Sequence, residues 1–305
     1  MSEKTTTVGR ISPGSRNAVL RNAVLRNAVL WGVVLSAATC LAAAPLRLTL
    51  PPELYALPGV EMAVYYDNVV LTETPEAYRF EVTCDVGAAE KRRWVVTPQA
   101  ADVGDHALAV TVRDAAGAEL GRAATTLKVV PADAGAGRTV RLLIVGDSLT
   151  HATTYSNEIA RLLSLPDNPR WTMLGTHKPS RAEAGVAHEG YGGWTWQRFV
   201  THYEPNPDGT YRKRSSPFVT LGADGKPVLD LKRYFDDACG GERPDFVTFL
   251  LGINDCFSAD PENPAAIDAR IDAMFAQADV LLAAFREAAP EAELGICLTT
   301  PPNAR

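Results

Sequence analysis

Residues 140–148 read VRLLIVGDS, and this stretch decides the fold class because an almost unbroken apolar run ends abruptly in Gly-Asp-Ser. A strand that is apolar on both faces is typical of the middle of a parallel sheet. The residues from Thr150 onward place Tyr155, Ile159 and Leu162 at helical spacing. The stretch therefore predicts a buried strand, a tight turn and a helix, which is the repeating unit of an α/β domain.

The same strand pattern recurs at 245–255 (DFVTFLLGIND) and at 293–302 (ELGICLTTPP). Between them a helix is expected to begin at Pro264, with Asn263 as its N-cap. Its buried face is predicted to contain Ile267, Ile271, Met274, Phe275, Ala278, Leu282 and Phe285. Residues 140–305 are therefore predicted to form an α/β domain with helices covering both faces of a parallel sheet.

Residues 45–131 follow a different pattern. Short runs rich in β-branched and aromatic residues, such as EMAVYYDNVVL and HALAVTVRD, are separated by turn residues at intervals of about ten positions. This pattern predicts a small all-β domain, an antiparallel sandwich of immunoglobulin-like type. Residues 132–139 are rich in small residues and form the expected linker.

Residues 1–44 have the layout of a secretory signal. The pentapeptide RNAVL occurs three times between Arg16 and Leu30 and lengthens a basic region, which a short apolar run and small residues follow. Cleavage is expected after Ala43, and the mature protein is expected in the cell envelope or outside the cell. Membrane contact is expected only through an uncleaved leader. Lipidation of Cys40 is the alternative, although Thr39 fits such processing poorly.

Charge and cysteine spacing exclude other classes of function. The net charge is -6, from 30 basic and 36 acidic residues, which argues against a nucleic-acid partner. No Cys-x-x-Cys or His-x-x-x-His spacing supports a metal site, and no cofactor is expected. Four cysteines would remain after removal of the leader, and their pairing is left open: Cys84, Cys239, Cys256 and Cys297.

Polar residues follow the predicted strands where a ligand of an open α/β sheet would bind, at the carboxyl ends. Ser148 follows the first strand, Asn254 follows the 245–255 strand, and the glycine-rich EGYGGWTW (189–196) lies between them in the chain. Each motif alone has a structural interpretation. Ser148 could simply cap a helix, and the glycines could serve only a turn.

Together, in this order and spacing, the motifs resemble those of the SGNH hydrolases, also called the GDSL esterase/lipase family. The resemblance spans about residues 140–305 and rests on three blocks: Gly146-Asp147-Ser148-Leu149, Gly192-Gly193-Trp194-Thr195 and Gly252-Ile253-Asn254-Asp255. It implies a flavodoxin-like sheet and a serine esterase that forms an acyl-enzyme. By this resemblance Ser148 is the nucleophile, and the oxyanion hole consists of its own amide, the Gly193 amide and the Asn254 side chain. Such converging donors are what acyl transfer requires.

The family's catalytic base comes from a fourth block, Asp-x-x-His, and none of the five histidines here is preceded by Asp at that spacing. We therefore expect that the sequence is incomplete at its C-terminus and that this chain alone has little esterase activity. His151, three residues after Ser148, is a possible substitute base that is expected to point along the helix surface instead.

The substrate is expected to be an acylated carbohydrate. Tyr191, Trp194 and Trp196 could form a stacking surface for a sugar ring, or they could pack in the core, and His188 could line the cleft. A hairpin and helix at 215–245 would shape specificity. The alternatives are a lipase or other acyl-ester hydrolase of the same family, and a non-catalytic glycan-binding surface protein. The β-sandwich would bind glycan or act as a structural brace.

Overall fold

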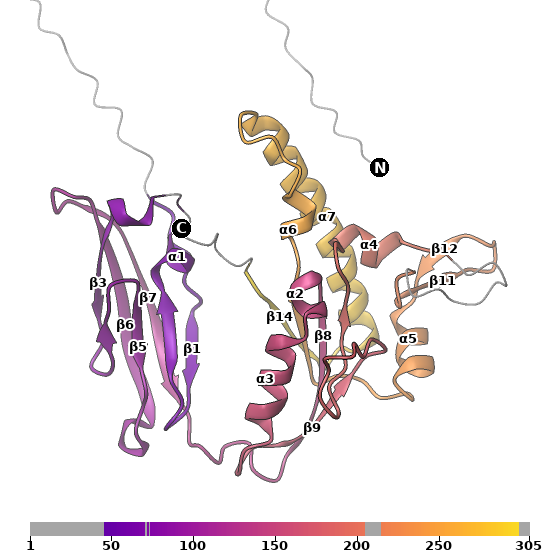
Figure 1. The fold of residues 1–305 in the computed structure, drawn as a ribbon, viewed down its shortest axis with the longest axis horizontal. Coiled ribbons are helices and arrows are strands. Elements are labelled where there is room, and N and C mark those ends of the chain that lie inside the picture. The colour runs from indigo at the N-terminus through magenta and orange to yellow at the C-terminus, as the bar shows by residue number, and fades with distance from the viewer. Residues whose placement is uncertain (1–45, 71, 73, 205–214, 299–305) are drawn as a thin grey trace, which may run out of the picture. The chain divides into compact units, whose positions relative to one another are not determined.

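The computed structural model describes residues 46–70, 72, 74–204 and 215–298 (Figure 1). Residues 46–130 and residues 139–298 form separate sheets. The predicted leader, residues 1–44, lies outside the described residues. None of the helices in the described ranges is both long enough and apolar enough to cross a lipid bilayer.

Residues 46–130 form two small sheets. One has the strand order β1-β7-β6-β3 and the other β2-β5-β4. The strands are β1 (Glu53–Ala56), β2 (Met62–Tyr65), β3 (Arg79–Thr83), β4 (Ala88–Ala89), β5 (Arg93–Val96), β6 (Gly104–Arg113) and β7 (Glu119–Val129). Three short helical segments connect them: α1 (Tyr66–Val69), η1 (Pro75–Ala77) and η2 (Ala100–Asp102).

The two small sheets share one apolar core. Val64 and Trp94 from one sheet are buried in the same cluster as Leu108 and Leu127 from the other. Buried and less buried residues alternate along β6, as expected where one face of a sheet is covered. The expectation of purely antiparallel pairing is wrong for β1, which pairs parallel with β7. The immunoglobulin-like sandwich stays a prediction.

Residues 139–298 form a mixed α/β unit around a parallel sheet of five strands. The strands are β8 (Thr139–Gly146), β9 (Arg170–Leu174), β10 (Glu189–Gly190), β13 (Phe246–Leu250) and β14 (Glu293–Ile296). On one side of β8, β9 pairs with its first half and β10 with its last two residues, while β13 and then β14 lie on the other side. The first and second strand patterns of the sequence, which form β8 and β13, are thus neighbours in the sheet.

Helices pack on both faces of this sheet, as the sequence predicts. They are α2 (Ser148–His151), α3 (Thr154–Leu163), α4 (Trp196–Thr201), α5 (Leu231–Ala238), α6 (Ile253–Cys256) and α7 (Pro264–Ala288). Leu143 and Val145 are buried with residues of α4, α5 and α7. Leu142 and Ile144 are buried with residues of α3. Because successive strand residues point to opposite faces, both faces of β8 are covered.

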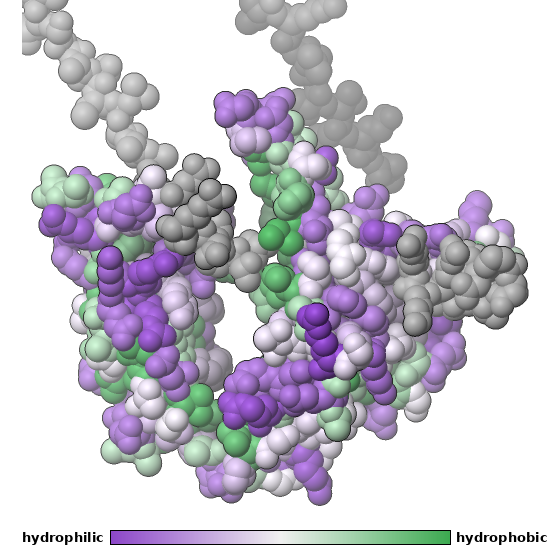
Figure 2. Space-filling view, in the orientation of Figure 1, coloured by the Kyte–Doolittle hydropathy of each residue, from purple (hydrophilic) through white to green (hydrophobic). Residues whose placement is uncertain are grey.

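The buried face of α7 differs from the prediction in one turn. Ala278 and Phe285 are buried as expected, but Leu281 is buried too, and Phe275 is 57% exposed. Figure 1 shows the N-terminal half of α7 extending past the end of the sheet, so this half has no sheet to cover its apolar side chains. In Figure 2 apolar surface follows α6 and this half of α7, where Phe257 is also exposed.

The predicted hairpin is present as β11 (Val219–Leu221) and β12 (Pro227–Leu229), which pair antiparallel and precede α5. The four cysteines of the described residues are unpaired.

The N-cap of α7 yields a testable prediction. Asn263 Oδ1 accepts a hydrogen bond from the Ala266 amide at 3.2 Å, and Pro264 follows at the first helical position. Asn263→Ala is expected to lower the free energy of unfolding by about 1 kcal/mol, because that amide loses its partner. Urea denaturation measures this loss. Asn263→Asp keeps the acceptor and is the control, and an equal loss in both variants would contradict a capping role.

Candidate active site

The turn after β8 is built around close backbone contacts. A side chain at Gly146 or at Gly190 would clash with the Thr150 side chain, so both strand ends need glycine. Asp147 is 1% exposed and caps α2, since its Oδ1 accepts a hydrogen bond from the Leu149 amide at 2.9 Å. This capping agrees with the expectation that Asp147 supports the turn.

Ser148 is the first residue of α2 and is exposed. Among the described residues its Oγ has no hydrogen-bond partner. The same holds for its backbone N–H, because the first amides of a helix have no acceptor within the helix. The serine therefore presents a hydroxyl and an amide to solvent at the carboxyl end of the central strand.

The second motif is anchored to the same strand end. The Tyr191 amide donates to the Gly146 carbonyl at 3.1 Å, which holds the loop directly beside the Ser148 turn. Gly193 has a φ of +73°, a conformation that favours glycine. Within the described part of the chain the Gly193 N–H donates no hydrogen bond, and the residue is exposed. A second unpaired amide thus lies in a loop that β10 joins to β8.

The third motif joins the other two. Asn254 Nδ2 donates to the Trp194 carbonyl at 3.0 Å and to Asp147 Oδ2 at 3.3 Å. The Trp196 amide donates to Asp255 Oδ1 at 3.2 Å. All three loops are therefore connected by hydrogen bonds at one edge of the sheet.

These contacts qualify the expected role of Asn254 as an oxyanion donor. Its amide group has two N–H donors, and both are already directed at Trp194 and Asp147. Donation to a substrate oxyanion requires release or sharing of one of them, and the longer 3.3 Å bond to Asp147 is the weaker of the two.

Glu189 is a structural residue that the sequence interpretation missed. Its carboxylate is fully buried and accepts hydrogen bonds from Thr176, Tyr191 and Tyr234 at distances between 2.5 and 3.1 Å. Burial raises the pKa of Glu189, and these donors oppose that rise. An acidic residue among glycines and aromatics, directly before the second motif, is the signal that could have indicated it. The bonds fix the start of the loop that carries Gly193.

The expected stacking surface for a sugar is wrong for both tryptophans. Trp194 is 4% exposed and packs against Phe199, and Trp196 is 2% exposed and stacks on Phe249. Their indole rings fill the core beneath α4, so they are unavailable to a substrate. Tyr191 is half-buried, with its hydroxyl bonded to Glu189.

The expectation that His188 lines the cleft is also wrong, because this residue is fully buried. Its Nδ1 accepts a hydrogen bond from the Gly190 amide, and its Nε2 lies 3.4 Å from Thr153 Oγ1. Burial, together with His177 and His151 nearby, lowers the pKa of His188 to about 4. The neutral imidazole is therefore part of the loop structure.

His151 is exposed, and its Nδ1 lies 2.9 Å from Nε2 of His177. Neither imidazole is within hydrogen-bonding distance of Ser148 Oγ. No cluster of three or more His, Cys, Asp or Glu in the described ranges is arranged to hold a metal ion.

Comparisons with known proteins leave the family open. No family model and no curated protein matches the chain. A Clostridium thermocellum family 3 carbohydrate esterase is similar in structure, with a TM-score of 0.29, 20% identity and coverage of 52% of this chain and 61% of the esterase. A sialyltransferase from Photobacterium damsela (TM-score 0.22, 12% identity) is matched over 79% of this chain and 50% of its own. A putative alpha-galactosidase/melibiase from Bacteroides fragilis has a TM-score of 0.22 and 9% identity, and the match covers 82% of this chain and 52% of that protein. TM-scores this low support no functional argument.

Proposed function

We propose that this chain is a serine esterase of the SGNH type that hydrolyses carboxylic esters through an acyl-enzyme. One observation carries the proposal: three loops are joined by hydrogen bonds at one sheet edge, and no described residue pairs with the Ser148 hydroxyl or with the amides of Ser148 and Gly193. An exposed nucleophile beside unpaired N–H donors is the arrangement that acyl transfer needs.

The strand order supports the same fold family. Across the sheet the strands are β9 and β10 at one edge, then β8, β13 and β14. If β9 and β10 count together as the second strand of the chain, the order is 2-1-3-4. This is the order of the flavodoxin-like fold, in which ligands bind where the strand order reverses. Here that point lies between the carboxyl ends of β8 and β13, which are followed by Ser148 and Asn254.

The proposed chemistry has two steps. Ser148 Oγ attacks the ester carbonyl and gives up its proton, and the tetrahedral oxyanion accepts hydrogen bonds from the Ser148 and Gly193 amides. The C–O bond to the alcohol then breaks, the alcohol leaves with a proton, and Ser148 is acylated. Water attacks the acyl-enzyme, releases the acid and returns the proton to Ser148. Asn254 becomes a third donor once its bond to Asp147 is shared.

The proton of Ser148 needs an acceptor, and none of the five histidines, all of which lie in the described ranges, is hydrogen-bonded to Oγ. We therefore include in the proposal a base of the family's Asp-x-x-His type that is not among the described residues. The chain alone is expected to react slowly at Ser148, because oxyanion stabilisation without a base retains only part of the rate.

The proposed substrate is an ester of a carbohydrate, and the proposed location is the cell envelope or outside the cell. The signal-like segment at 1–44 supports export. The net charge of -6 argues against a nucleic-acid partner. Membrane contact would occur only through an uncleaved leader.

The test is covalent labelling with a fluorophosphonate followed by peptide mapping. We expect the phosphonyl group on the peptide that contains Ser148 and on no other serine. Labelling elsewhere, or none after prolonged incubation, would refute the esterase proposal.

The absence of an imidazole at Ser148 Oγ favours a second candidate, a glycan-binding protein with a degenerate hydrolase domain. It predicts carbohydrate binding with no labelling of Ser148 under any condition.

A further inference from the structure

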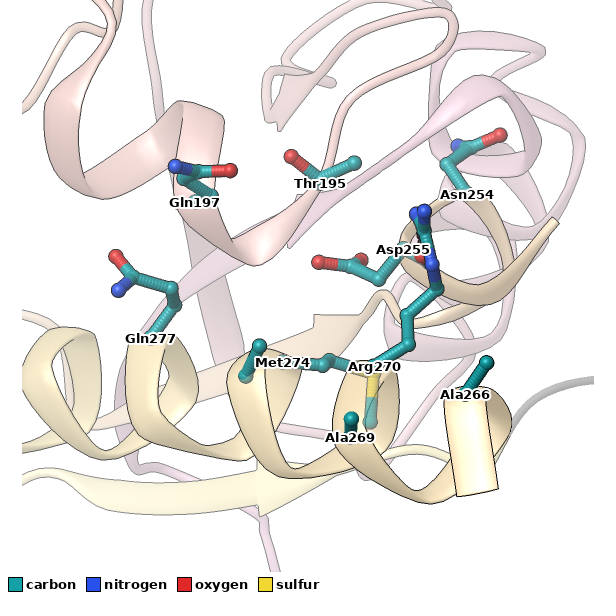
Figure 3. A pocket seen from close by; sticks show the side chains of 10 residues that line it. Thr195, Gln197, Asn254, Asp255, Ala266, Ala269, Arg270, Met274 and Gln277 are labelled. Carbon is teal, nitrogen blue, oxygen red and sulfur yellow. Dashed lines mark hydrogen bonds between the residues drawn. The ribbon is translucent and has the colours of Figure 1, made fainter. Parts of the chain in front are cut away.

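An open groove of about 510 Å³ begins beside Asn254 and runs along α7 toward α4. Figure 3 shows its two sides. Met274, Arg270 and Gln277 project from α7, and Gln197 lies opposite on α4. The groove therefore starts at one residue of the proposed oxyanion site, Asn254, and extends away from it along α7.

Polar side chains from both sides line the groove: Gln197 from α4, and Arg270 and Gln277 from α7. Arg270 uses Nη1 to donate to the Asp255 carbonyl at 3.2 Å, and its other N–H groups make no hydrogen bond within the described residues. The Gln197 amide is exposed at the far end. Apolar atoms form the larger part of the lining surface, and they include the Met274 side chain and alanine methyl groups such as that of Ala273, on which a C–H face of a sugar ring could pack.

The side chain of Gln277 has a buried oxygen atom that lacks a hydrogen-bond partner among the described residues. Its Oε1 is buried, and no donor of the described residues lies within hydrogen-bonding distance. An unpaired buried carbonyl costs stability, so such an atom is usually matched by a partner. Here it belongs to a residue that lines the groove, so a rotation of the amide group toward the groove would let a ligand hydroxyl supply that partner.

We propose that this groove binds the carbohydrate part of the ester substrate, with sugar hydroxyls bonded to Gln277, Gln197 and Arg270 and a C–H face of the ring on Met274. This inference rests on the proposed function for its orientation, because the ester carbonyl would lie at Asn254. In this proposal the groove residues, and not the buried tryptophans, provide the specificity for carbohydrate.

Methionine methyl groups provide a direct reporter. The chain has four methionines: Met274 lines the groove, Met62 lies in β2, Met173 is buried in β9, and Met1 belongs to the leader. In ¹³C-methyl-methionine NMR of Ser148→Ala, we expect xylotetraose, cellotetraose or mannotetraose, in free or O-acetylated form, to shift the Met274 signal. The signals of Met62 and Met173 should stay in place.

Variants separate binding in the groove from other causes. Ala273→Leu should block the groove and weaken the saccharide Kd at least tenfold, while Ala276→Leu makes the same change on α7 at a residue that does not line it. Gln277→Leu should also weaken binding about tenfold, yet raise Tm by about 2 °C because a buried unpaired carbonyl is removed. A residue with a purely structural role would lower Tm instead.

The outcomes distinguish this inference from the proposed function. A Met274 shift with p-nitrophenyl octanoate but with none of the saccharides would assign the groove to the acyl chain and overturn the inference, while the esterase could stand. No shift with any probe would also overturn it. Saccharide binding that Ala273→Leu abolishes, without labelling of Ser148 in the parent protein, would support the groove and refute the esterase.

Discussion

Ser148→Ala is expected to abolish labelling by a fluorophosphonate, whereas the parent protein takes up one phosphonyl group. The reason is chemical, since Ser148 Oγ is the atom that forms the bond to phosphorus, and the amides of Ser148 and Gly193 stabilise the adduct. We expect the rate to fall by at least a hundredfold, to the level of non-specific reaction with other hydroxyl groups. Intact-protein mass spectrometry over time measures this rate.

Added imidazole makes the experiment sharper. Because no histidine of the described structure is hydrogen-bonded to Ser148 Oγ, free imidazole should act as the missing general base and raise the labelling rate about tenfold or more. Ser180 is also exposed, and Ser180→Ala is the matched control, which should behave like the parent protein. Labelling of Ser148 that imidazole does not accelerate would mean that the chain already has a base.

The second large effect is a loss of stability in acid that His188 causes. The pKa of His188 is about 4 in the folded protein and has an ordinary value of 6.5 in the unfolded chain. Below pH 6.5 the unfolded chain gains a proton that the folded protein does not bind, so stability falls as the pH falls. The loss amounts to about 2 kcal/mol between pH 7.5 and pH 5, and approaches about 3 kcal/mol below pH 4.

The physical cause is visible in the hydrogen bonds. His188 Nδ1 accepts from the Gly190 amide, so a protonated ring would place two N–H groups against each other in a fully buried position. His188→Asn offers an oxygen acceptor that does not titrate. Urea unfolding of both proteins at pH 7.5 and pH 5 should therefore show a smaller acid loss in the variant, even if its stability at pH 7.5 is lower.

His106 provides the opposite control. The Asp102 carbonyl and the Asp85 carboxylate accept hydrogen bonds from its imidazole and raise its pKa, so it favours folding as the pH falls. His106→Gln should keep the acid loss of the parent protein or increase it. Equal acid loss in His188→Asn and the parent protein would contradict the assignment to His188.

Periodicity and local capping predicted much of the fold. The apolar run at 140–146 is β8 at the middle of a parallel sheet, and Asn263 caps α7 as expected. These features depend on neighbouring residues, so the chain order alone carries them. The pairing of β1 was not predictable in this way, because a parallel partner 73 residues along the chain, as in Glu53 with Thr126, leaves no local signal.

For the site, the sequence by itself determined which residues stand at the strand ends: Ser148, Gly193 and Asn254. Only the tertiary structure decided which side chains around them are accessible. Trp194, Trp196 and His188 lie within or next to the same motif, yet packing against the sheet and helices buries them. Gln277 lines the groove only because α7 packs beside α4 and α6. Burial is a sum over contacts from distant segments, so no local stretch of sequence contains it.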